Sequence, residues 1–241
     1  MIPESNRQRL LLRYVPPVVA IAVIVLFVSL GRWQLDRAAQ KEALQASFAD
    51  DSAYAAVSGE LTVQPFQRLE ASGQYLDDRQ FLIDNMIVDN RLGYFVITPF
   101  EFDRNEALLL VNRGWIARPA DRSELPSIDV SNDYTKVLGM AGTLPRVGIR
   151  PGDAFLPDTP WPKIALFPTP AELTTELGRD VLPFVLLLNP EPDSELVRRW
   201  QPHVTGPMTH YGYAFQWFAM AATVLVILVW QQRRKGRRAV Q

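Results

Sequence analysis

The hydrophobic pattern of this chain consists of two long apolar segments on either side of a middle section with shorter apolar runs. Residues 14–31 contain no charged side chain, and neither do residues 200–232, which are most apolar over 213–230. About 18 or more apolar residues are enough to cross a bilayer as a helix, which satisfies its own backbone hydrogen bonds there. The pattern therefore predicts transmembrane helices over 14–31 and 210–230, with one domain, residues 32–209, between them.

The middle section is typical of a β-rich domain. Apolar, β-prone runs predict strands over residues 79–88, 93–98, 107–116, 136–144 and 184–188. The polar turn 103–106 joins two of these runs, which favours a hairpin. Residues 108–111 are apolar throughout, so we expect a central strand covered on both faces. The resulting fold class is two transmembrane α-helices flanking a periplasmic α+β domain with a mainly antiparallel sheet.

Three further elements are predicted from local signals. Thr169-Pro170-Ala171-Glu172 is a capping box that starts a helix ending near Gly178. A short helix is expected over 193–200, and the Pro-rich segment 145–168 is expected to be an irregular loop. No Gly or Pro interrupts residues 32–49, so the first transmembrane helix should continue to Ala49. We expect Gly114 to serve a turn or bulge.

The distribution of charge predicts the orientation in the membrane. The N-terminal tail, residues 1–13, carries three Arg against one Glu, and the C-terminal tail, 231–241, carries five basic residues and no acid. Short basic segments stay in the cytoplasm, so both tails should be cytoplasmic and the domain periplasmic. The section between the tails has 17 basic and 25 acidic residues, a net charge of −8. An acidic domain gives no electrostatic reason to expect nucleic-acid binding.

The first apolar segment could also be a secretory signal peptide. However, no small-residue cleavage site follows it, because the next residues are Gly31-Arg32-Trp33-Gln34. An uncleaved anchor fits better. The N-terminal tail is also too short for a mitochondrial transit peptide, which favours the inner membrane of a bacterium.

The composition leaves few groups for catalysis or metal binding. The chain has no Cys, which excludes disulfides and every Cys-ligated metal site, and its two histidines are His203 and His210. Nucleophile-elbow, zinc-protease, P-loop and dinucleotide-binding motifs are absent. The acid pairs at 50–51 and 77–78 are typical of solvated loops. We therefore do not expect an enzyme.

His210 is the strongest candidate ligand. It lies in an aromatic stretch at the start of the second apolar segment, near Tyr213 and Trp217. A neutral imidazole in such a setting can bind haem iron axially. The alternative is an interfacial histidine that hydrogen-bonds a carbonyl or a lipid headgroup, within an ordinary belt of aromatic residues.

Four segments in order carry a resemblance to a known family. They are 31–37 with Lys41; Gly93-Tyr94 with Thr98-Pro99; 111–115; and His210 with Tyr213-Ala214 and 216–218. Together with two spans and one outer domain, they resemble the Surfeit-locus family of cytochrome c oxidase assembly factors. The resemblance covers essentially the whole chain.

The resemblance implies assembly of a haem–copper oxidase rather than catalysis. It implies haem a as a transiently bound cofactor with His210 as iron ligand, and the oxidase catalytic subunit as partner. A haem a synthesis enzyme would be a further partner, and the lipid bilayer surrounds the spans. One departure is Thr209, where many members have Asn, so any orienting role of that Asn is in doubt.

The remaining candidate contacts each have two interpretations. Trp33 and Trp217 could flank a groove for the macrocycle between the two spans, or the spans could simply pack through Gly31 and Ala214. Arg113 could form a buried charge pair that fixes the domain, or meet haem propionates. For the whole chain, the alternatives to a haem a chaperone are a cofactor-free scaffold for the nascent oxidase subunit and a membrane-anchored domain with an unrelated ligand.

Overall fold

The structure is a computed structural model and describes residues 4–49, 52–58, 62–102, 107–121, 124–150, 152–155, 159–200 and 206–238. The chain divides into two compact units. One combines residues 1–46 with 203–241, and the other comprises residues 47–202. We describe each unit by itself.

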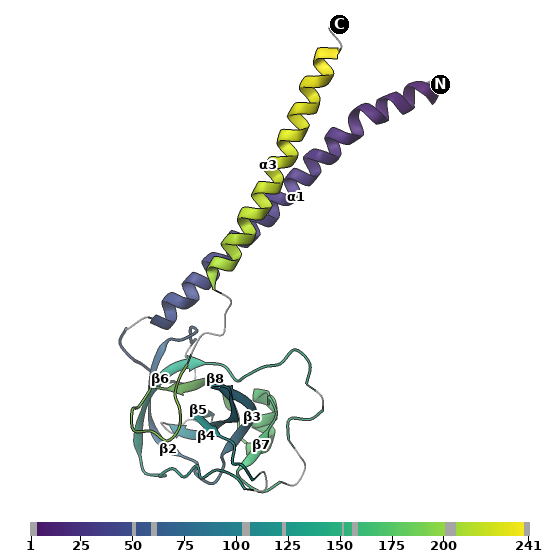
Figure 1. Ribbon diagram of the computed structural model, residues 1–241. Coiled ribbons are helices and arrows are strands. Elements are labelled where there is room, and N and C mark those ends of the chain that lie inside the picture. Colours follow the sequence, from purple (N-terminus) through teal and green to yellow (C-terminus); the bar gives the residue numbers. More distant parts are fainter. Residues whose placement is uncertain are drawn as a thin grey trace. The chain divides into compact units, whose positions relative to one another are not determined.

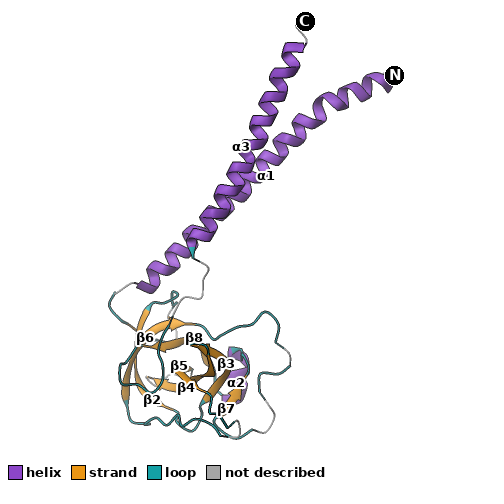
Figure 2. Cartoon of the chain, viewed as in Figure 1, coloured by secondary structure: helices purple, strands orange, loops and turns teal. Residues whose placement is uncertain are grey.

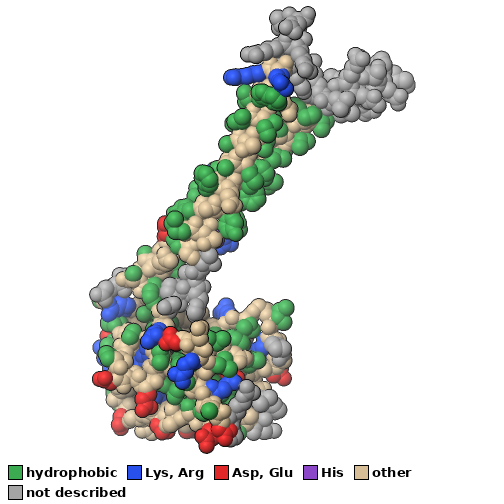
Figure 3. Space-filling view, viewed as in Figure 1, with side chains coloured by type: hydrophobic (Ala, Val, Ile, Leu, Met, Phe, Trp, Pro, Cys, Tyr) green, Lys and Arg blue, Asp and Glu red, His purple; other side chains and the backbone are tan. Residues whose placement is uncertain are grey.

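The first unit is a pair of long helices, α1 (Glu4–Ala49) and α3 (Pro207–Arg238), drawn in purple in Figure 2. Both are long and apolar enough to cross a membrane. Hydrophobic side chains, drawn in green, recur along the described length of the pair in Figure 3. With 46 residues, α1 is about 70 Å long, whereas a bilayer core is about 30 Å thick, so α1 must extend beyond it. The predicted continuation to Ala49 is confirmed.

The second unit is built on a mixed sheet that closes into a barrel (Figure 1). Its strands are β1 (Ala55–Ala56), β2 (Arg68–Tyr75), β3 (Phe81–Val88), β4 (Arg91–Phe102), β5 (Leu108–Ala117), β6 (Thr135–Gly142), β7 (Lys163–Ala165) and β8 (Val181–Leu188). The order β2-β6-β8-β5-β4 closes because β4 also pairs with β2. Only β5 and β8 are parallel within this ring, so the mainly antiparallel sheet is confirmed.

The predicted strands and hairpin are present with small shifts at their ends. All five predicted runs correspond to strands, namely β3, β4, β5, β6 and β8. Strand β4 continues through Pro99, which lies opposite Leu110. The closure itself was not predicted, because it depends on β2, where Gly, Ala and Ser give a weak strand signal.

Strand β5 is buried on both faces, as its apolar run predicts. Leu109 and Val111 belong to one hydrophobic cluster with Phe100 and Leu186. Leu110 belongs to a second cluster on the other face. The side chains of β5 thus alternate between two cores, as a strand's period of two requires.

Helix α2 (Pro170–Leu177) is the only short helix among the described residues, and its capping box is present as predicted. The Thr169 hydroxyl accepts a hydrogen bond from the Glu172 N–H, while the Glu172 carboxylate accepts one from the Thr169 N–H. The helix ends at Gly178 in a left-handed conformation. Leu173 anchors α2 in the second cluster.

Two local predictions were wrong, and tertiary pairing explains both. Residues 193–200 form no helix, because Val197 instead pairs with Trp115 of β5 through two backbone hydrogen bonds of 2.8 Å. The segment 145–168 is not entirely irregular, since β7 pairs with β3 in parallel. In both cases, backbone groups of a strand that had no other strand beside them provided hydrogen-bond partners, which the local sequence does not show.

Gly114 occupies a bulge, as expected. Its φ is +138°, and the register between β4 and β5 shifts beside it. A Cβ at this position would lie 2.8 Å from the Cβ of Leu196. Backbone conformation and close packing therefore both require glycine here.

Candidate functional site

Helices α1 and α3 contact each other along one stripe of each helix. Between residues 210 and 228 of α3 the more buried positions are 210, 214, 217, 218, 221, 224 and 228, and between residues 17 and 44 of α1 they are 17, 20, 23, 24, 27, 30, 31, 34, 38, 41 and 44. Steps of three and four residues are the spacing of a left-handed helix pair. Small residues make up the closest contacts: Gly31, Ala38, Ala214 and Ala221 are buried.

The contact between Gly31 and Phe218 leaves no space between the helices at that level. A Cβ on Gly31 would lie 2.7 Å from the Phe218 ring. One turn further toward the cytoplasmic end expected for α1, the rings of Phe27 and Trp217 have centroids 5.5 Å apart. The described residues therefore show the packing through Gly31 and Ala214 that the sequence offered as one of two alternatives.

His210 of α3 forms a hydrogen bond with α1. Its Nδ1 lies 2.8 Å from Oε1 of Gln34, and the imidazole is partly buried. If Oε1 accepts this bond, the proton is on Nδ1 and the lone pair is on Nε2. The hydroxyl of Tyr211, the next residue of α3, donates a 2.9 Å hydrogen bond to the Glu42 carboxylate of α1. Two polar contacts thus fix the register of the helices around His210.

The aromatic candidates lie at different distances from the helix contact. Tyr213 and Trp217 are three and seven residues after His210, which places the three on one side of α3. Trp217 is partly buried against Phe27, whereas the Tyr213 side chain is about half exposed, at 49%. Trp33 is 50% exposed, and the Arg37 guanidinium lies 5.6 Å from its ring centroid.

The surroundings of His210 suit its imidazole to serve as one axial ligand of a haem iron. The Nε2 atom makes no hydrogen bond to any residue that the structure describes, while Nδ1 is held by Gln34. A hydrogen bond on one ring nitrogen fixes the tautomer and orientation that metal binding by the other nitrogen needs. Because the helices are in contact at Gly31, the described residues leave no groove between them at that level, and the exposed Tyr213 ring lies outside the contact.

Gln34 is the functional candidate that sequence analysis did not single out. It belongs to the segment 31–37 that carries the family resemblance, but nothing local links it to a histidine 176 residues away. Thr209, whose orienting role the sequence left in doubt, is exposed. The hydrogen bond to the imidazole is made by Gln34 instead. The second histidine, His203, lies outside the described residues.

Arg113 belongs to the barrel unit and is held by three acceptors. Its Nη1 donates to Oε1 of Gln80 (2.9 Å) and to the Ile128 carbonyl (2.7 Å), and its Nη2 donates to the Asp129 carbonyl (2.9 Å). Oε1 of Gln80 also accepts from the buried hydroxyl of Thr98. Burial lowers the pKa of Arg113 below its ordinary value, but an arginine stays charged at neutral pH. The guanidinium fastens the segment containing residues 128 and 129 to the sheet.

Comparison with known proteins gives a consistent result. A sequence model of the SURF1 family matches residues 21–222. A SURF1-like protein of Monosiga brevicollis is 25% identical over 245 residues, covering 91% of this chain and 88% of that protein. A SURF1-like protein of Rickettsia bellii is 24% identical over 240 residues, covering 92% of each. A third, from Rickettsia felis, is 24% identical over 233 residues, covering 89% of this chain and 96% of that protein.

Proposed function

The chain belongs to the SURF1 family, which implies a role in cytochrome oxidase assembly, and we propose that it carries haem a to the oxidase catalytic subunit. The observation that supports this is the His210–Gln34 hydrogen bond. It orients an imidazole at the edge of the helix pair and leaves Nε2 to bind iron. Delivery of a cargo requires only binding and release, so no covalent step is needed.

Each residue of the proposed site has a separate part. His210 binds the iron of the cargo, and Gln34 holds the proton on Nδ1. Tyr213 and Trp217 give the same side of α3 an aromatic surface against which an apolar macrocycle can pack. Trp33 of α1 offers a further exposed ring, and the guanidinium of Arg37, 5.6 Å from the centre of that ring, can meet a carboxylate of the cargo.

Arg113 has a structural part in this proposal. All three of its observed hydrogen bonds are made within the barrel unit, so a propionate contact would have to replace at least one of them. Replacing a buried hydrogen bond leaves its partner unsatisfied at a cost of about 1–3 kcal/mol. We therefore assign Arg113 to the stability of the domain.

The proposal includes the orientation expected from the charges. The chain is placed in a bacterial inner membrane with both termini in the cytoplasm and the barrel in the periplasm. The site at His210 then lies toward the periplasmic end of the spans. Its partners would be the oxidase catalytic subunit and, for loading, an enzyme of haem a synthesis.

The experiment is to co-express the chain with haem a synthesis enzymes, purify it in detergent and measure haem by visible spectrum and extraction. Near-stoichiometric haem in the wild type, lost or spectrally altered in His210→Ala, supports the proposal. Haem that is unchanged in His210→Ala moves the ligand elsewhere. A folded wild type without haem refutes the cargo and leaves the cofactor-free scaffold.

A further inference from the structure

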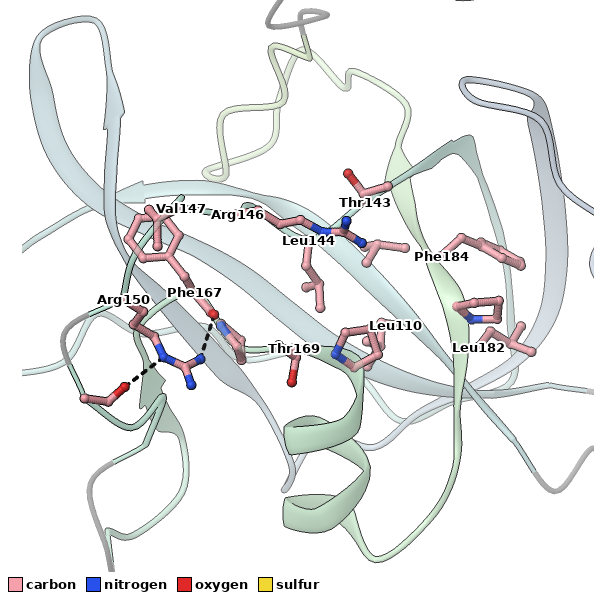
Figure 4. A pocket seen from close by; sticks show the side chains of 15 residues that line it. Leu110, Thr143, Leu144, Arg146, Val147, Arg150, Phe167, Thr169, Leu182 and Phe184 are labelled. Carbon is pink, nitrogen blue, oxygen red and sulfur yellow. Dashed lines mark hydrogen bonds between the residues drawn. The ribbon is translucent and has the colours of Figure 1, made fainter.

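The barrel wall has an opening where β6 and β8 separate. Their pairing stops at Gly142 opposite Val185, whereas β8 begins four residues earlier, at Val181. After Gly142 the chain leaves the sheet, and a cavity of about 340 Å³ lies between this departing segment, β8 and the start of α2 (Figure 4). This volume is at the small end of the range for ligand pockets.

The base of this pocket is apolar. Leu110, Leu144, Leu182 and Phe184 line it, and none is more than 7% exposed. The open part of β8 also contains Pro183, which has no N–H to donate to an added strand. The pocket is therefore suited to an inserted apolar side chain rather than to a strand added at the sheet edge.

The charged residues of the lining are two arginines, without any Asp or Glu. Arg150 is already neutralised, because it donates to both carboxylate oxygens of Glu172 and to the carbonyls of Phe167 and Gly152. Arg146 is exposed and makes no hydrogen bond or ion pair to any residue in the described part of the chain. In Figure 4 its guanidinium lies near Leu144 and Thr143. The pocket thus carries one uncompensated positive charge above an apolar base.

Exposed apolar side chains continue the pocket onto the surface. Val147 is 41% exposed and Ile149 is 91% exposed, and both lie on the segment that carries Arg146. A small molecule confined to the cavity would leave Ile149 in water. An apolar patch next to a pocket and bordered by charge marks a protein-binding surface.

We propose that this pocket docks a segment of a partner protein that carries an aliphatic side chain next to a carboxylate. The aliphatic side chain fills the space over Leu144 and Leu182, the carboxylate pairs with Arg146, and the flanking residues cover Val147 and Ile149. A flat lipid surface would not fill the concave base. This docking site belongs to the barrel unit and does not depend on the haem site.

The test begins with peptide display on the full chain in nanodiscs, using random heptapeptides. A selected peptide is then synthesised together with its variant in which the acid is replaced by the amide. We expect selection of sequences with an acid next to an aliphatic residue, and at least tenfold weaker binding after amide replacement. Selection of sequences without an acid overturns the proposal.

Matched variants locate the binding. Arg146→Glu and Ile149→Ser should each weaken the peptide at least tenfold. Arg91→Glu and Ile87→Ser should not, since Arg91 is exposed, Ile87 is 69% exposed, and neither lines the pocket. All four side chains are exposed, so the variants are expected to fold, which circular dichroism checks. Equal binding by all four variants contradicts the assignment to this pocket.

A second measurement separates a protein partner from a membrane surface. The chain has no Cys, so Ile149→Cys can be labelled at one place with an environment-sensitive fluorophore, with Ile87→Cys as the control. In nanodiscs with spin-labelled lipids, we expect equal and weak quenching at both positions and a blue shift at 149 on adding peptide. Strong lipid quenching at 149 alone means that the patch lies on the bilayer, and it refutes the protein partner.

Discussion

Replacement of Arg113 by Met should destabilise the barrel unit without changing haem binding by the folded protein. The change keeps an unbranched side chain but removes three hydrogen bonds from a cation to Gln80, Ile128 and Asp129. Hydrogen bonds to charged groups contribute about 1.5–3 kcal/mol each, although such values do not add simply. An acceptor left unsatisfied costs about 1–3 kcal/mol, so for these three acceptors together we expect about 3–5 kcal/mol. We take that range as the expected loss in free energy of unfolding.

The effect is large enough to measure in the intact chain. For a domain of this size, a loss of 1 kcal/mol in free energy of unfolding lowers the thermal unfolding midpoint by about 2–4 °C. The midpoint of Arg113→Met should therefore lie about 10 °C below that of the wild type. Tryptophan fluorescence can follow the transition, because Trp115 is buried in the barrel and donates to the Met86 carbonyl. Arg91→Met, at an exposed position, is the control and should change the midpoint little.

Arg113→Lys adds a test of geometry. A single ammonium cannot reproduce the two nitrogens that Arg113 directs to separate acceptors, so we expect a loss intermediate between wild type and Arg113→Met. An unchanged midpoint in Arg113→Met, with haem lost from the folded protein, would refute the structural role. It would favour the alternative in which Arg113 meets the propionates.

Three other predictions concern single contacts. Hydrogen bonds from Arg150 lower the pKa of Glu172 to about 2. Glu172→Gln should therefore lower the free energy of unfolding at pH 7 by about 1–2 kcal/mol, a value discounted for solvent screening because the Glu172 side chain is 31% exposed. The native carboxylate is stabilised above pH 4.5 and this stabilisation is lost as the pH falls toward 2, so the two denaturation midpoints should converge there; a constant difference would contradict the assignment. Gly114→Ala should destabilise the barrel by about 2–4 kcal/mol, since the Cβ is strained at φ +138° and meets Leu196; thermal unfolding equal to wild type would show that the bulge relaxes. Gln34→Leu should weaken haem retention about ten- to a hundredfold in dilution experiments, because the imidazole loses its acceptor. Gln34→Glu keeps an acceptor and should retain haem. Equal haem retention by the two variants would show that Gln34 is not part of the site.

Local signals in the sequence predicted the elements whose stability is local. The capping box at Thr169 fixed the start of α2, and the uninterrupted helix formers after Gly31 predicted α1 to Ala49. The apolar run in β5 predicted burial on both faces, because a strand with one face in solvent has alternating apolar and polar residues. Gly114 was expected at a turn or bulge, because glycine has no Cβ that would be strained there.

Long-range pairing accounts for what the sequence did not show. Residues 193–200 have an acceptable helix composition, but Val197 gains two backbone hydrogen bonds to β5 and Leu196 packs in a cluster with Val96. Barrel closure depends on Gly73 lying opposite Phe102, a contact between strands that are not neighbours in sequence. Packing of this kind overrides weak local propensity.

The candidate site divides in the same way. An aromatic stretch around His210 is visible in the sequence and is sufficient to propose an iron ligand. Its partner Gln34 is 176 residues away, and only the pairing of α1 with α3 brings it within hydrogen-bond distance. The exposure of Tyr213 and the partial burial of Trp217 likewise follow from the rotation of α3 against α1, which no single segment determines.

The central claim, that His210 binds the iron of a haem cargo, is tested most directly by imidazole rescue. Wild-type protein and His210→Ala are purified after co-expression with haem a synthesis, and their visible spectra and haem content are measured with and without added imidazole. The proposal predicts stoichiometric haem a in the wild type, its loss in His210→Ala, and recovery of the spectrum when imidazole is supplied during loading. Identical haem content and spectra in the wild type and His210→Ala, without imidazole, would contradict it.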